Sequence, residues 1–544
     1  MRVKRVTEIT IRKYAKPDAD CPGLIDGCIL EARARDIFFA DSDAYMLPTV
    51  FLIGAGPGDP GLLTLRGAEL LGRCDVVLYD GLSNSQLLAH APRAELICVG
   101  KHGQSRIWRQ EEIIDEMLRH ARAGKVVARL KGGDPAVFAR TAEEAEALRD
   151  AGIAFEIVPG ITAALAAGSY AGIPITHRKY ASAVALVTGH EEPDKDESAL
   201  DWDALAKFPG TLVVYMGVTT AGAWTAALMQ AGKPADTPAA ILRRCSLPDQ
   251  QTVHCRLDEV AQRLTPATKM RPPVIVIIGE VTRLAHSMSW FDTRPLFGKT
   301  VLVTRAEQQA DELAEPLRSL GAEVITQPAI RIEPLESFDQ LDREIARLAD
   351  YDYLVFSSRN GVQHFMQRFL EVVGDLRDLA WTKIAVVGPR TADMLATYHI
   401  RADVVAEGMS ADSLAESLLE EADDNQFLLV RASRGPDTLA QHLQQAGGEV
   451  RSIVAYSHTD VSHPDDAILR RMAAGEIDSV TVTSDAIARS VVRLFGDALH
   501  QTRLVSLSPG VTQTLRSLGF TVAAEAAVPT MQSLVDAIAT QSPD

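Results

Sequence analysis

The sequence predicts an α/β fold in two consecutive halves, each built from mostly parallel sheets covered by helices. Short Val, Ile and Leu runs alternate with stretches of helical periodicity from Thr49 almost to the end of the chain. This strand–helix–strand order is typical of a parallel sheet. The chain has 544 residues, and one hydrophobic core rarely exceeds roughly 250–300 residues. Several domains are therefore expected.

The composition narrows the class of protein. The net charge of −17 and an aromatic content of 6% disfavour a nucleic-acid partner. The six cysteines form no CxxC pair, so we expect a reducing, cytoplasmic location and no structural zinc. His177 and His190 match no metal-binding helix pattern, so no metal site is predicted. No apolar run approaches the ~20 residues of a membrane span, and no membrane partner is expected.

Residues 1–47 begin with basic residues that acidic ones soon interrupt. The segment matches neither a secretory signal nor a mitochondrial presequence. It is expected to be a poorly ordered extension, and we assign it no function.

The elements of the first half follow from hydrophobic pattern and punctuation. Helices are predicted at 63–71 and around 113–121, the second ended by Gly124. A glycine-rich turn is expected at 54–61 and another at 131–135. The predicted strands lie at 50–53, 76–79, 126–130, 184–188, 212–216 and 274–278.

The first turn, GAGPGDPG, superficially matches a dinucleotide-binding fingerprint. That fingerprint needs a third glycine where Asp59 stands, and Pro57 and Pro60 remove N–H donors that a phosphate would use. An NAD-dependent oxidoreductase is therefore a weaker alternative.

The second half begins after a short linker at 290–296 and contains an internal repeat. Gly388 and Leu414 are separated by 26 positions, as are Ser508 and Leu534, with similar helices and strands between them. The matched spacing favours a duplication, and two similar lobes facing each other across a cleft are the simplest architecture.

Hydroxyl groups and arginines gather at the predicted strand-to-helix turns of this half. Such turns present free backbone N–H groups that bind carboxylates. Several of them around one cleft suit a polycarboxylate ligand. The predicted substrate-binding residues are Arg305, Ser357, Ser358, Thr391, Ser433, Thr483 and Ser484.

Ordered motifs in the first half resemble one known family. They include YDGL (79–82), VGKH (99–102), RLKGGDPAVFAR (129–140), VPGITAA (158–164) and VVYMG (213–217). Over residues 49–292 the chain resembles the tetrapyrrole methylases, and most closely the uroporphyrinogen-III C-methyltransferases. The resemblance implies a two-lobed methylase fold, an S-adenosylmethionine site in the cleft between the lobes, and a homodimer.

The resemblance also implies roles for individual residues. Asp80 matches the family's proton acceptor and Lys101 its proton donor, although an ion pair of these two that only fixes loops is the alternative. Cys245 departs from the family, since relatives often carry a glycine there. The implied cofactor-binding residues are Pro57, Gly132, Gly133, Asp134, Val137, Thr162, Ala163, Met216 and Cys245.

Motifs of the second half, such as FSSRNGV (356–362), VVGPRTA (386–392) and TSDAI (483–487), resemble uroporphyrinogen-III synthase over residues 299–540. The resemblance implies closure of linear hydroxymethylbilane with inversion of the last ring and loss of water. Tyr456 matches a family tyrosine that assists departure of the hydroxyl; a half-buried strand tyrosine is the alternative. Ser508 departs from the family's closing turn, which leaves a weakened second active site as a possibility.

We therefore expect an extension at 1–47, a methyltransferase at 48–292 and a uroporphyrinogen-III synthase at 293–544. Together they would convert hydroxymethylbilane to uroporphyrinogen III and methylate it twice to precorrin-2, towards siroheme or cobalamin. The alternative is a tetrapyrrole methylase of different regiospecificity with a noncatalytic, tetrapyrrole-binding C-terminal module.

Overall fold

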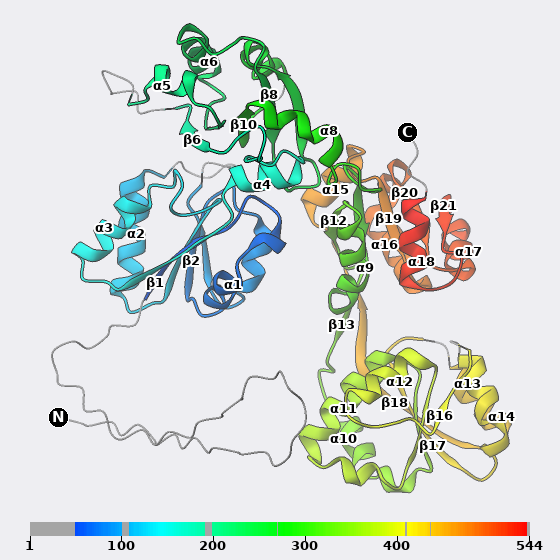
Figure 1. The fold of residues 1–544 in the computed structure, drawn as a ribbon. Helices are drawn as coiled ribbons and strands as arrows, with labels where there is room; N and C mark the ends of the chain where they lie inside the picture. The colour runs from blue at the N-terminus through cyan, green and yellow to red at the C-terminus, as the bar shows by residue number, and fades with distance from the viewer. Residues whose placement is uncertain are drawn as a thin grey trace, which may run out of the picture. The chain divides into compact units, whose positions relative to one another are not determined.

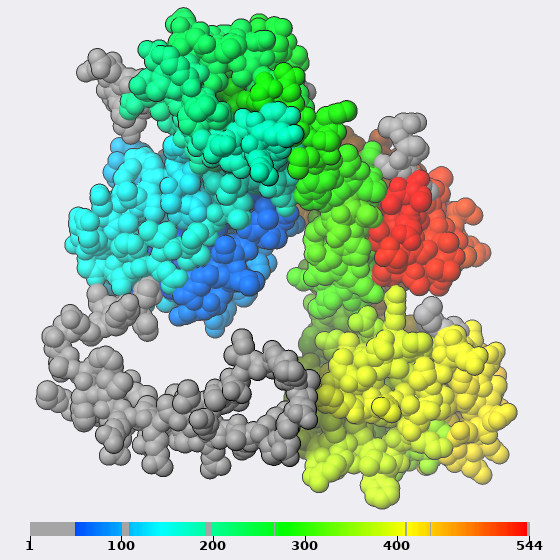
Figure 2. Space-filling model, in the orientation of Figure 1, coloured from blue at the N-terminus to red at the C-terminus, as the bar shows by residue number. Residues whose placement is uncertain are grey.

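The computed structural model describes residues 49–100, 108–190, 199–268, 270–408, 411–435 and 437–540. The expected extension at 1–47 and Lys101, the implied proton donor, lie outside the described residues. Contacts divide the chain into two compact units, with the boundary between Thr162 and Ala163. Both units are mixed α/β structures with parallel-rich sheets, which confirms the predicted fold class (Figure 1). Figure 2 shows the same view in space-filling form, coloured by residue number. Within the described part of the chain, no helix is both long and apolar enough to cross a bilayer.

The first unit is built on one parallel sheet with strand order β3-β2-β4-β1-β5. Every residue of β1 and β4 is buried, as are Val76–Leu78 of β2, which is the pattern of a sheet covered on both faces. Thr64 caps the first helix by accepting from the Gly67 N–H at 3.1 Å, and Gly124 follows the second helix with a φ of +79°. The elements are β1 (Val50–Gly54), α1 (Leu65–Leu71), β2 (Val76–Tyr79), β3 (Glu95–Cys98), α2 (Gln110–Arg122), β4 (Val127–Lys131), α3 (Thr141–Asp150) and β5 (Phe155–Val158).

The second unit begins with a sheet of order β6-β7-β10-β8-β9. Only β6 and β7 pair in parallel; the pairs β7–β10, β10–β8 and β8–β9 are antiparallel. The expectation of mostly parallel pairing was therefore wrong for this sheet, because a buried apolar run reads the same in either direction. The elements are α4 (Ala163–Tyr170), β6 (Val184–Thr188), α5 (Trp202–Lys207), β7 (Thr211–Tyr215), α6 (Ala221–Gln230), β8 (Pro238–Arg243), β9 (Gln251–Arg256) and β10 (Val274–Ile278).

The rest of the second unit consists of two lobes. Lobe A (299–328 and 462–540) holds the sheet β12-β11-β19-β20-β21, and lobe B (329–461) holds the sheet β13-β18-β17-β14-β15-β16. Lobe A contains β11 (Thr300–Val303), α9 (Glu307–Ser319), β12 (Glu323–Thr326), α15 (Asp466–Ala473), β19 (Ser479–Val482), α16 (Asp485–Phe495), β20 (Arg503–Ser506), α17 (Pro509–Ser517), β21 (Val522–Glu525) and α18 (Met531–Ala539). Lobe B contains β13 (Ile330–Glu333), α10 (Asp339–Ile345), β14 (Tyr353–Phe356), α11 (Arg359–Val372), β15 (Lys383–Val386), α12 (Pro389–Ala396), β16 (Val404–Val405), α13 (Ala411–Leu418), β17 (Gln426–Ala432), α14 (Thr438–Gln445) and β18 (Glu449–Asp460).

The internal repeat appears as two equivalent sheets. The order β18-β17-β14-β15-β16 of lobe B matches the order β12-β11-β19-β20-β21 of lobe A. Gly388 precedes α12 and Ser508 precedes α17 at the same place in each lobe. The antiparallel pair β13–β18 belongs to lobe B at the point where the chain enters and leaves it (Figure 1). Lobe B is thus inserted between β12 and α15 of lobe A.

Candidate functional site

The predicted residues of the first unit lie along one edge of its sheet. Asp80 directly follows β2, Pro57 lies in the turn after β1, and Gly132 opens the turn after β4. These three strands are neighbours in the order β2-β4-β1, so their carboxyl ends share an edge. Ligands of parallel α/β sheets bind at this edge.

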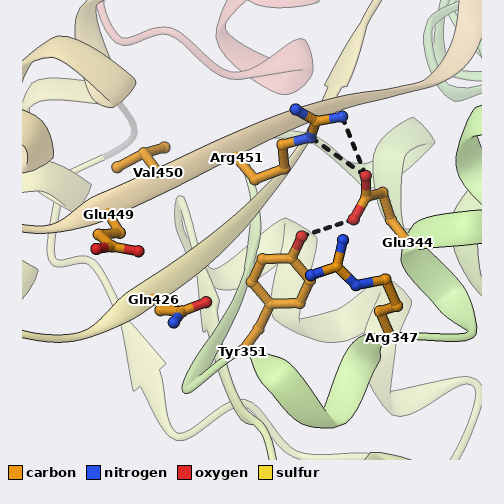
Figure 3. Close-up of a pocket in the computed structure, with 7 residues that line it drawn as sticks. All are labelled: Glu344, Arg347, Tyr351, Gln426, Glu449, Val450 and Arg451. Carbon is orange, nitrogen blue, oxygen red and sulfur yellow. Dashed lines mark hydrogen bonds and ion pairs between the residues drawn. The ribbon is translucent and has the colours of Figure 1, made fainter.

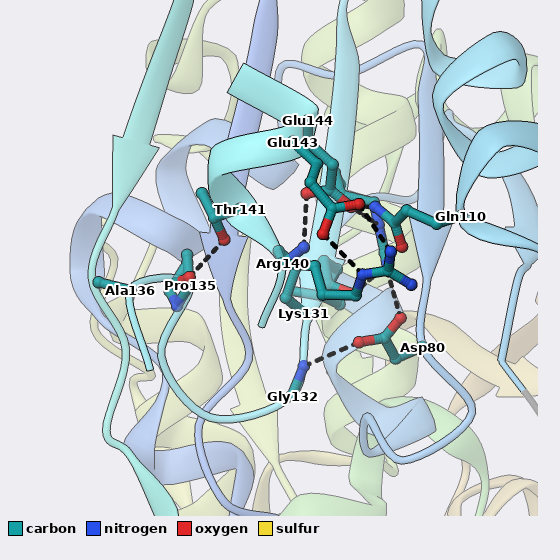
Figure 4. A network of polar contacts seen from close by, with 12 residues as sticks. Asp80, Gln110, Lys131, Gly132, Pro135, Ala136, Arg140, Thr141, Glu143 and Glu144 are labelled. Carbon is teal, nitrogen blue, oxygen red and sulfur yellow. Dashed lines mark hydrogen bonds and ion pairs between the residues drawn. The ribbon is translucent and has the colours of Figure 1, made fainter. Parts of the chain in front are cut away.

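Asp80 is held at this edge by two donors. Its Oδ1 accepts from Arg129 Nη2 at 2.5 Å, and its Oδ2 accepts from the Gly132 N–H at 3.2 Å (Figure 4). The Asp80 side chain is 29% exposed, whereas that of Arg129 is 4% exposed. The carboxylate is therefore oriented from within the protein and still open on one side, as a base that receives a proton from a ligand must be.

Behind Asp80 lies a buried charge network that the sequence analysis did not identify. Arg129 and Lys131 alternate along β4, so their side chains share one face of the sheet. Glu144 on α3 accepts from Arg129 Nε at 3.2 Å and from Lys131 Nζ at 2.5 Å, and its side chain is 0% exposed. Gln110 donates to the same carboxylate at 3.2 Å. The sequence feature that could have revealed this network is the pair of cationic residues, Arg129 and Lys131, in the otherwise apolar strand β4.

The pKa shifts of the two cations follow from their surroundings. Burial opposes the charge of Arg129, but the carboxylates of Asp80 and Glu144 outweigh it and raise the pKa of the guanidinium. For Lys131, burial prevails over the attraction of Glu144, and the pKa of the amine is lowered. Arg129 is thus a permanently charged hydrogen-bond partner of Asp80.

The glycine-rich turns bring three strand ends into close contact. A Cβ on Gly54 would lie 2.6 Å from Gly160 Cα, and one on Gly160 would lie 2.2 Å from the Gly133 carbonyl oxygen. Asp134 stabilises this close contact, since its carboxylate accepts hydrogen bonds from the Ala136 N–H at 2.7 Å and the Gly160 N–H at 2.9 Å. Val137 closes the same turn by a backbone bond to the Asp134 carbonyl. Gly54 and Gly160 are therefore required by packing, independently of any ligand.

The remaining predicted cofactor residues lie outside these turns. Thr162 is buried at the end of the first unit, and Ala163 begins α4. Met216 follows β7 with a φ of +53° and is 50% exposed; such backbone is strained for a residue with a side chain and is common at functional sites. Cys245 is buried, and burial raises the pKa of its thiol to about 12. Its thiol is therefore neutral and unsuited to nucleophilic chemistry.

In the second unit a cleft of about 310 Å³ lies between elements of lobes A and B. The structure brings four of the predicted residues together there: Arg305, Tyr456, Thr483 and Ser484. The other lining residues are Gln309, Ile330, Ile332, Asn360, Arg390, His458, Ile487, Leu507 and Met531. Gln309 and His458 are polar residues that the sequence analysis missed.

Tyr456 is the central hydroxyl of this cleft. Its Oη and Ser358 Oγ lie 3.1 Å apart, and its ring stacks on His364 with a centroid distance of 5.3 Å. Burial raises the pKa of the phenol, although hydrogen bonds from Ser358 and Asn360 oppose the shift. The group is thus a neutral hydrogen-bond donor at physiological pH. Ser358 also caps α11 by accepting from the Gly361 N–H at 3.0 Å.

Four predicted substrate residues do not line the cleft: Ser357, Ser358, Thr391 and Ser433. The Ser433 hydroxyl accepts from the His458 N–H at 2.8 Å and joins β17 to β18. The Ser357 hydroxyl donates to the Val430 carbonyl at 3.4 Å, and Thr391 is only 3% exposed in α12. These side chains support the cleft walls, which a sequence motif does not distinguish from ligand contact.

A second pocket of about 300 Å³ lies in lobe B (Figure 3). It is lined by Gln426 and Glu449, the first residues of β17 and β18, and therefore lies at the edge opposite the ligand edge. Its buried carboxylate, Glu344, accepts from Tyr351 Oη at 2.6 Å and from Arg451 Nε at 3.2 Å. These contacts satisfy the buried carboxylate, so we assign this pocket a structural role.

Two family models match different parts of the chain. Residues 49–261 match the model of the Tetrapyrrole (Corrin/Porphyrin) Methylases, and residues 311–536 match that of Uroporphyrinogen-III synthase HemD. Asp80 and the glycine-rich turns lie in the first match. Tyr456 and most residues that line its cleft lie in the second, which Arg305 and Gln309 precede.

Three relatives are similar over large parts of their own lengths. Porphyrin biosynthesis protein HemD of Ruminiclostridium josui is 34% identical over 82% of this chain and 89% of its own length. Uroporphyrinogen-III C-methyltransferase of Bacillus subtilis is 38% identical over 61% of this chain and 68% of its own. An S-adenosyl-L-methionine-dependent uroporphyrinogen III methyltransferase of Methanosarcina barkeri is 47% identical over 43% of this chain and 92% of its own.

Proposed function

We propose that this chain, which belongs to the porphyrin-biosynthesis family that joins a tetrapyrrole methylase to a uroporphyrinogen-III synthase HemD region, catalyses two consecutive reactions. The HemD-like region closes hydroxymethylbilane to uroporphyrinogen III, and the methylase region methylates that product twice to precorrin-2. The observation that carries the proposal is the presence, within the two matched regions, of a positioned carboxylate, Asp80, and a cleft built around the neutral phenol of Tyr456.

S-adenosylmethionine is the methyl donor in this proposal, as the name of the archaeal relative suggests. The turn after β4 fits such a group, since a Cβ on Gly132 would meet only Leu82 at 3.9 Å, which leaves room for a ligand against the backbone. When bound, the cofactor supplies an electrophilic methyl group. Pro57, Gly132, Gly133, Asp134 and Val137 would hold it. The contacts of Thr162, Ala163, Met216 and Cys245 stay predictions.

Asp80 serves as the proton acceptor of the methyl transfer. When a pyrrole carbon forms its bond to the incoming methyl group, the pyrrole N–H must lose its proton so that the ring stays neutral. The open side of the Asp80 carboxylate accepts that proton, while Arg129 holds the opposite oxygen in place. Most of the remaining rate enhancement comes from positioning, which can supply up to ~7–11 kcal/mol.

Tyr456 assists ring closure in the second unit. The C–O bond of the hydroxymethyl group breaks and the oxygen leaves as water. The macrocycle closes by C–C bond formation with inversion of the last ring, in which one bond between a pyrrole carbon and a bridging CH₂ breaks as another forms, and a pyrrole carbon loses a proton. Tyr456 Oη donates a hydrogen bond to the departing oxygen, and the raised pKa of the phenol keeps this proton in place. The cationic side chains of Arg305 and Arg390 bind carboxylates of the substrate.

Tyr456→Phe is expected to slow ring closure about 10- to 100-fold, because the departing oxygen loses one charge-assisted hydrogen bond worth roughly 1.5–3 kcal/mol. The measurement is the initial rate of uroporphyrinogen III formation from hydroxymethylbilane, corrected for spontaneous closure. Tyr398→Phe, in the same lobe but outside the cleft lining, is the matched control. An unchanged rate for Tyr456→Phe would remove the phenol from the mechanism.

The methylase reaction is tested with uroporphyrinogen III and S-adenosylmethionine carrying a ¹³C-labelled methyl group. The proposal expects a product with two labelled methyl groups, at the ring carbons that define precorrin-2, located by NMR. Labelled methyl groups at other carbons would support a methylase of different regiospecificity instead.

A further inference from the structure

Three arginines, two of which line the cleft, converge on one carboxylate. Glu312 on α9 lies 3.0 Å from Arg305, 3.8 Å from Arg359 and 3.5 Å from Arg390, measured between side-chain nitrogen and oxygen atoms. Arg305 and Glu312 belong to lobe A, whereas Arg359 and Arg390 begin α11 and α12 in lobe B. All three arginines follow the carboxyl ends of parallel strands, where ligands bind.

The cluster carries more positive charge than Glu312 neutralises. Three guanidiniums share one carboxylate, and among the described residues Arg359 and Arg390 have no other acidic partner. Their distances to Glu312 exceed the 2.7–2.9 Å of a good charge-assisted hydrogen bond. Both side chains are about two-fifths exposed, so they are free to turn towards another anion.

The surroundings separate Arg305 from the other two arginines. Arg305 is buried and is further fixed by Gln309 Oε1 at 3.2 Å, and Gln309 in turn donates to Asn360 at 3.0 Å. Arg305 and Arg390 line the cleft. Glu312 therefore has one close ion-pair partner in its own lobe, Arg305, and two more distant partners in lobe B, Arg359 and Arg390.

We propose that Arg305, Arg359 and Arg390 form a carboxylate subsite that Glu312 occupies when substrate is absent, and that a carboxylate of the linear tetrapyrrole displaces Glu312 from Arg359 and Arg390. This inference rests on the proposed cyclisation, because hydroxymethylbilane carries eight carboxylates. Glu312 then keeps its contact with Arg305. Before substrate binds, the Glu312 side chain links the two lobes at this point. After binding, the substrate carboxylate takes over its contacts with lobe B.

The test is a mutant cycle in the full chain. Glu312→Gln removes the competing charge, so the KM for hydroxymethylbilane and the inhibition constant of benzenehexacarboxylate are expected to fall about fivefold, the size of a partly exposed ion pair. In an Arg359→Gln/Arg390→Gln background, the same substitution is expected to change both constants by less than about twofold. An unchanged or raised KM for Glu312→Gln, or an equal effect in both backgrounds, would overturn the proposal.

Asp460→Asn is the matched control for a general loosening of the lobes. Asp460 accepts from Arg434 of lobe B at 2.8 Å and from Arg493 of lobe A at 2.6 Å, so it joins the lobes, but it does not line the cleft. Asp460→Asn is expected not to lower the KM. An equal fall in KM for this variant would contradict competition by Glu312.

A second readout separates this subsite from the proposed reaction. Phenylglyoxal labels accessible arginines, and benzenehexacarboxylate is expected to protect the peptides that contain Arg359 and Arg390, more strongly in Glu312→Gln than in the unchanged protein. Protection without turnover of hydroxymethylbilane would support the subsite while overturning the cyclisation. Turnover without protection would overturn the subsite alone.

Discussion

Asp80→Asn is expected to lower the rate of methyl transfer by about 10²–10⁴-fold, the usual contribution of a general base. Asparagine keeps the size of the side chain but cannot accept a proton from the pyrrole. The affinity for S-adenosylmethionine is expected to change far less. The two effects are separated by single-turnover methyl transfer and by calorimetric titration of the cofactor.

Asp75→Asn provides the matched control for this substitution. Asp75 precedes β2 at the opposite edge of the same sheet, and its carboxylate accepts from the Val126 N–H at 2.8 Å. It should therefore affect stability but not the chemical step. Equal losses of methyl transfer and of cofactor affinity in Asp80→Asn would show that Asp80 only holds the site together.

Glu144→Gln is expected to destabilise the first unit by about 3–5 kcal/mol, because it leaves Arg129 and Lys131 buried without their shared carboxylate. Opening of β4 is measured by hydrogen exchange with mass spectrometry. The pKa of Lys131 is already lowered by burial. As the pH rises, Lys131 therefore loses its proton at a lower pH in the folded protein than in the unfolded chain. The loss of stability caused by Glu144→Gln should thus become smaller as the pH approaches the ordinary pKa of lysine, roughly 10.4.

The neighbouring Glu143→Gln is the control for this effect. Glu143 pairs with Arg140 at 2.8 Å on the exposed side of α3 (Figure 4), and such surface pairs contribute about 0–1 kcal/mol. If Glu144→Gln opened β4 no more than Glu143→Gln, the buried network would not support the sheet.

Local features of the fold followed directly from the sequence. The apolar runs at 76–79, 184–188 and 274–278 are strands with the same limits as predicted, because short runs rich in β-branched residues between turns favour extended backbone. The repeat of 26 positions likewise predicted two equivalent sheets. In contrast, the antiparallel pairing of β7, β10, β8 and β9 depends on strand order, which no local pattern encodes.

The candidate sites were predictable only in part, for a similar reason. Asp80 and Tyr456 stood in recognisable motifs, but the partners of Asp80 depend on β4 pairing next to β2. Glu144 and Glu312 lie on helices, where a carboxylate usually faces solvent, and only tertiary contact shows that each meets buried arginine. Ser433 and Thr391 do not line the cleft, because the Ser433 hydroxyl accepts from the His458 N–H and the Thr391 side chain is buried in α12; their contact with substrate stays a prediction.

The central claim is that one chain carries out both consecutive steps, and one incubation tests it most directly. The full chain is supplied with hydroxymethylbilane, with and without S-adenosylmethionine carrying labelled methyl groups, and the tetrapyrroles are identified by mass and isomer analysis. The account predicts uroporphyrinogen III without the cofactor and a twice-labelled precorrin-2 with it. Formation of only the spontaneous isomer, uroporphyrinogen I, with no label incorporated by correctly folded protein would contradict it.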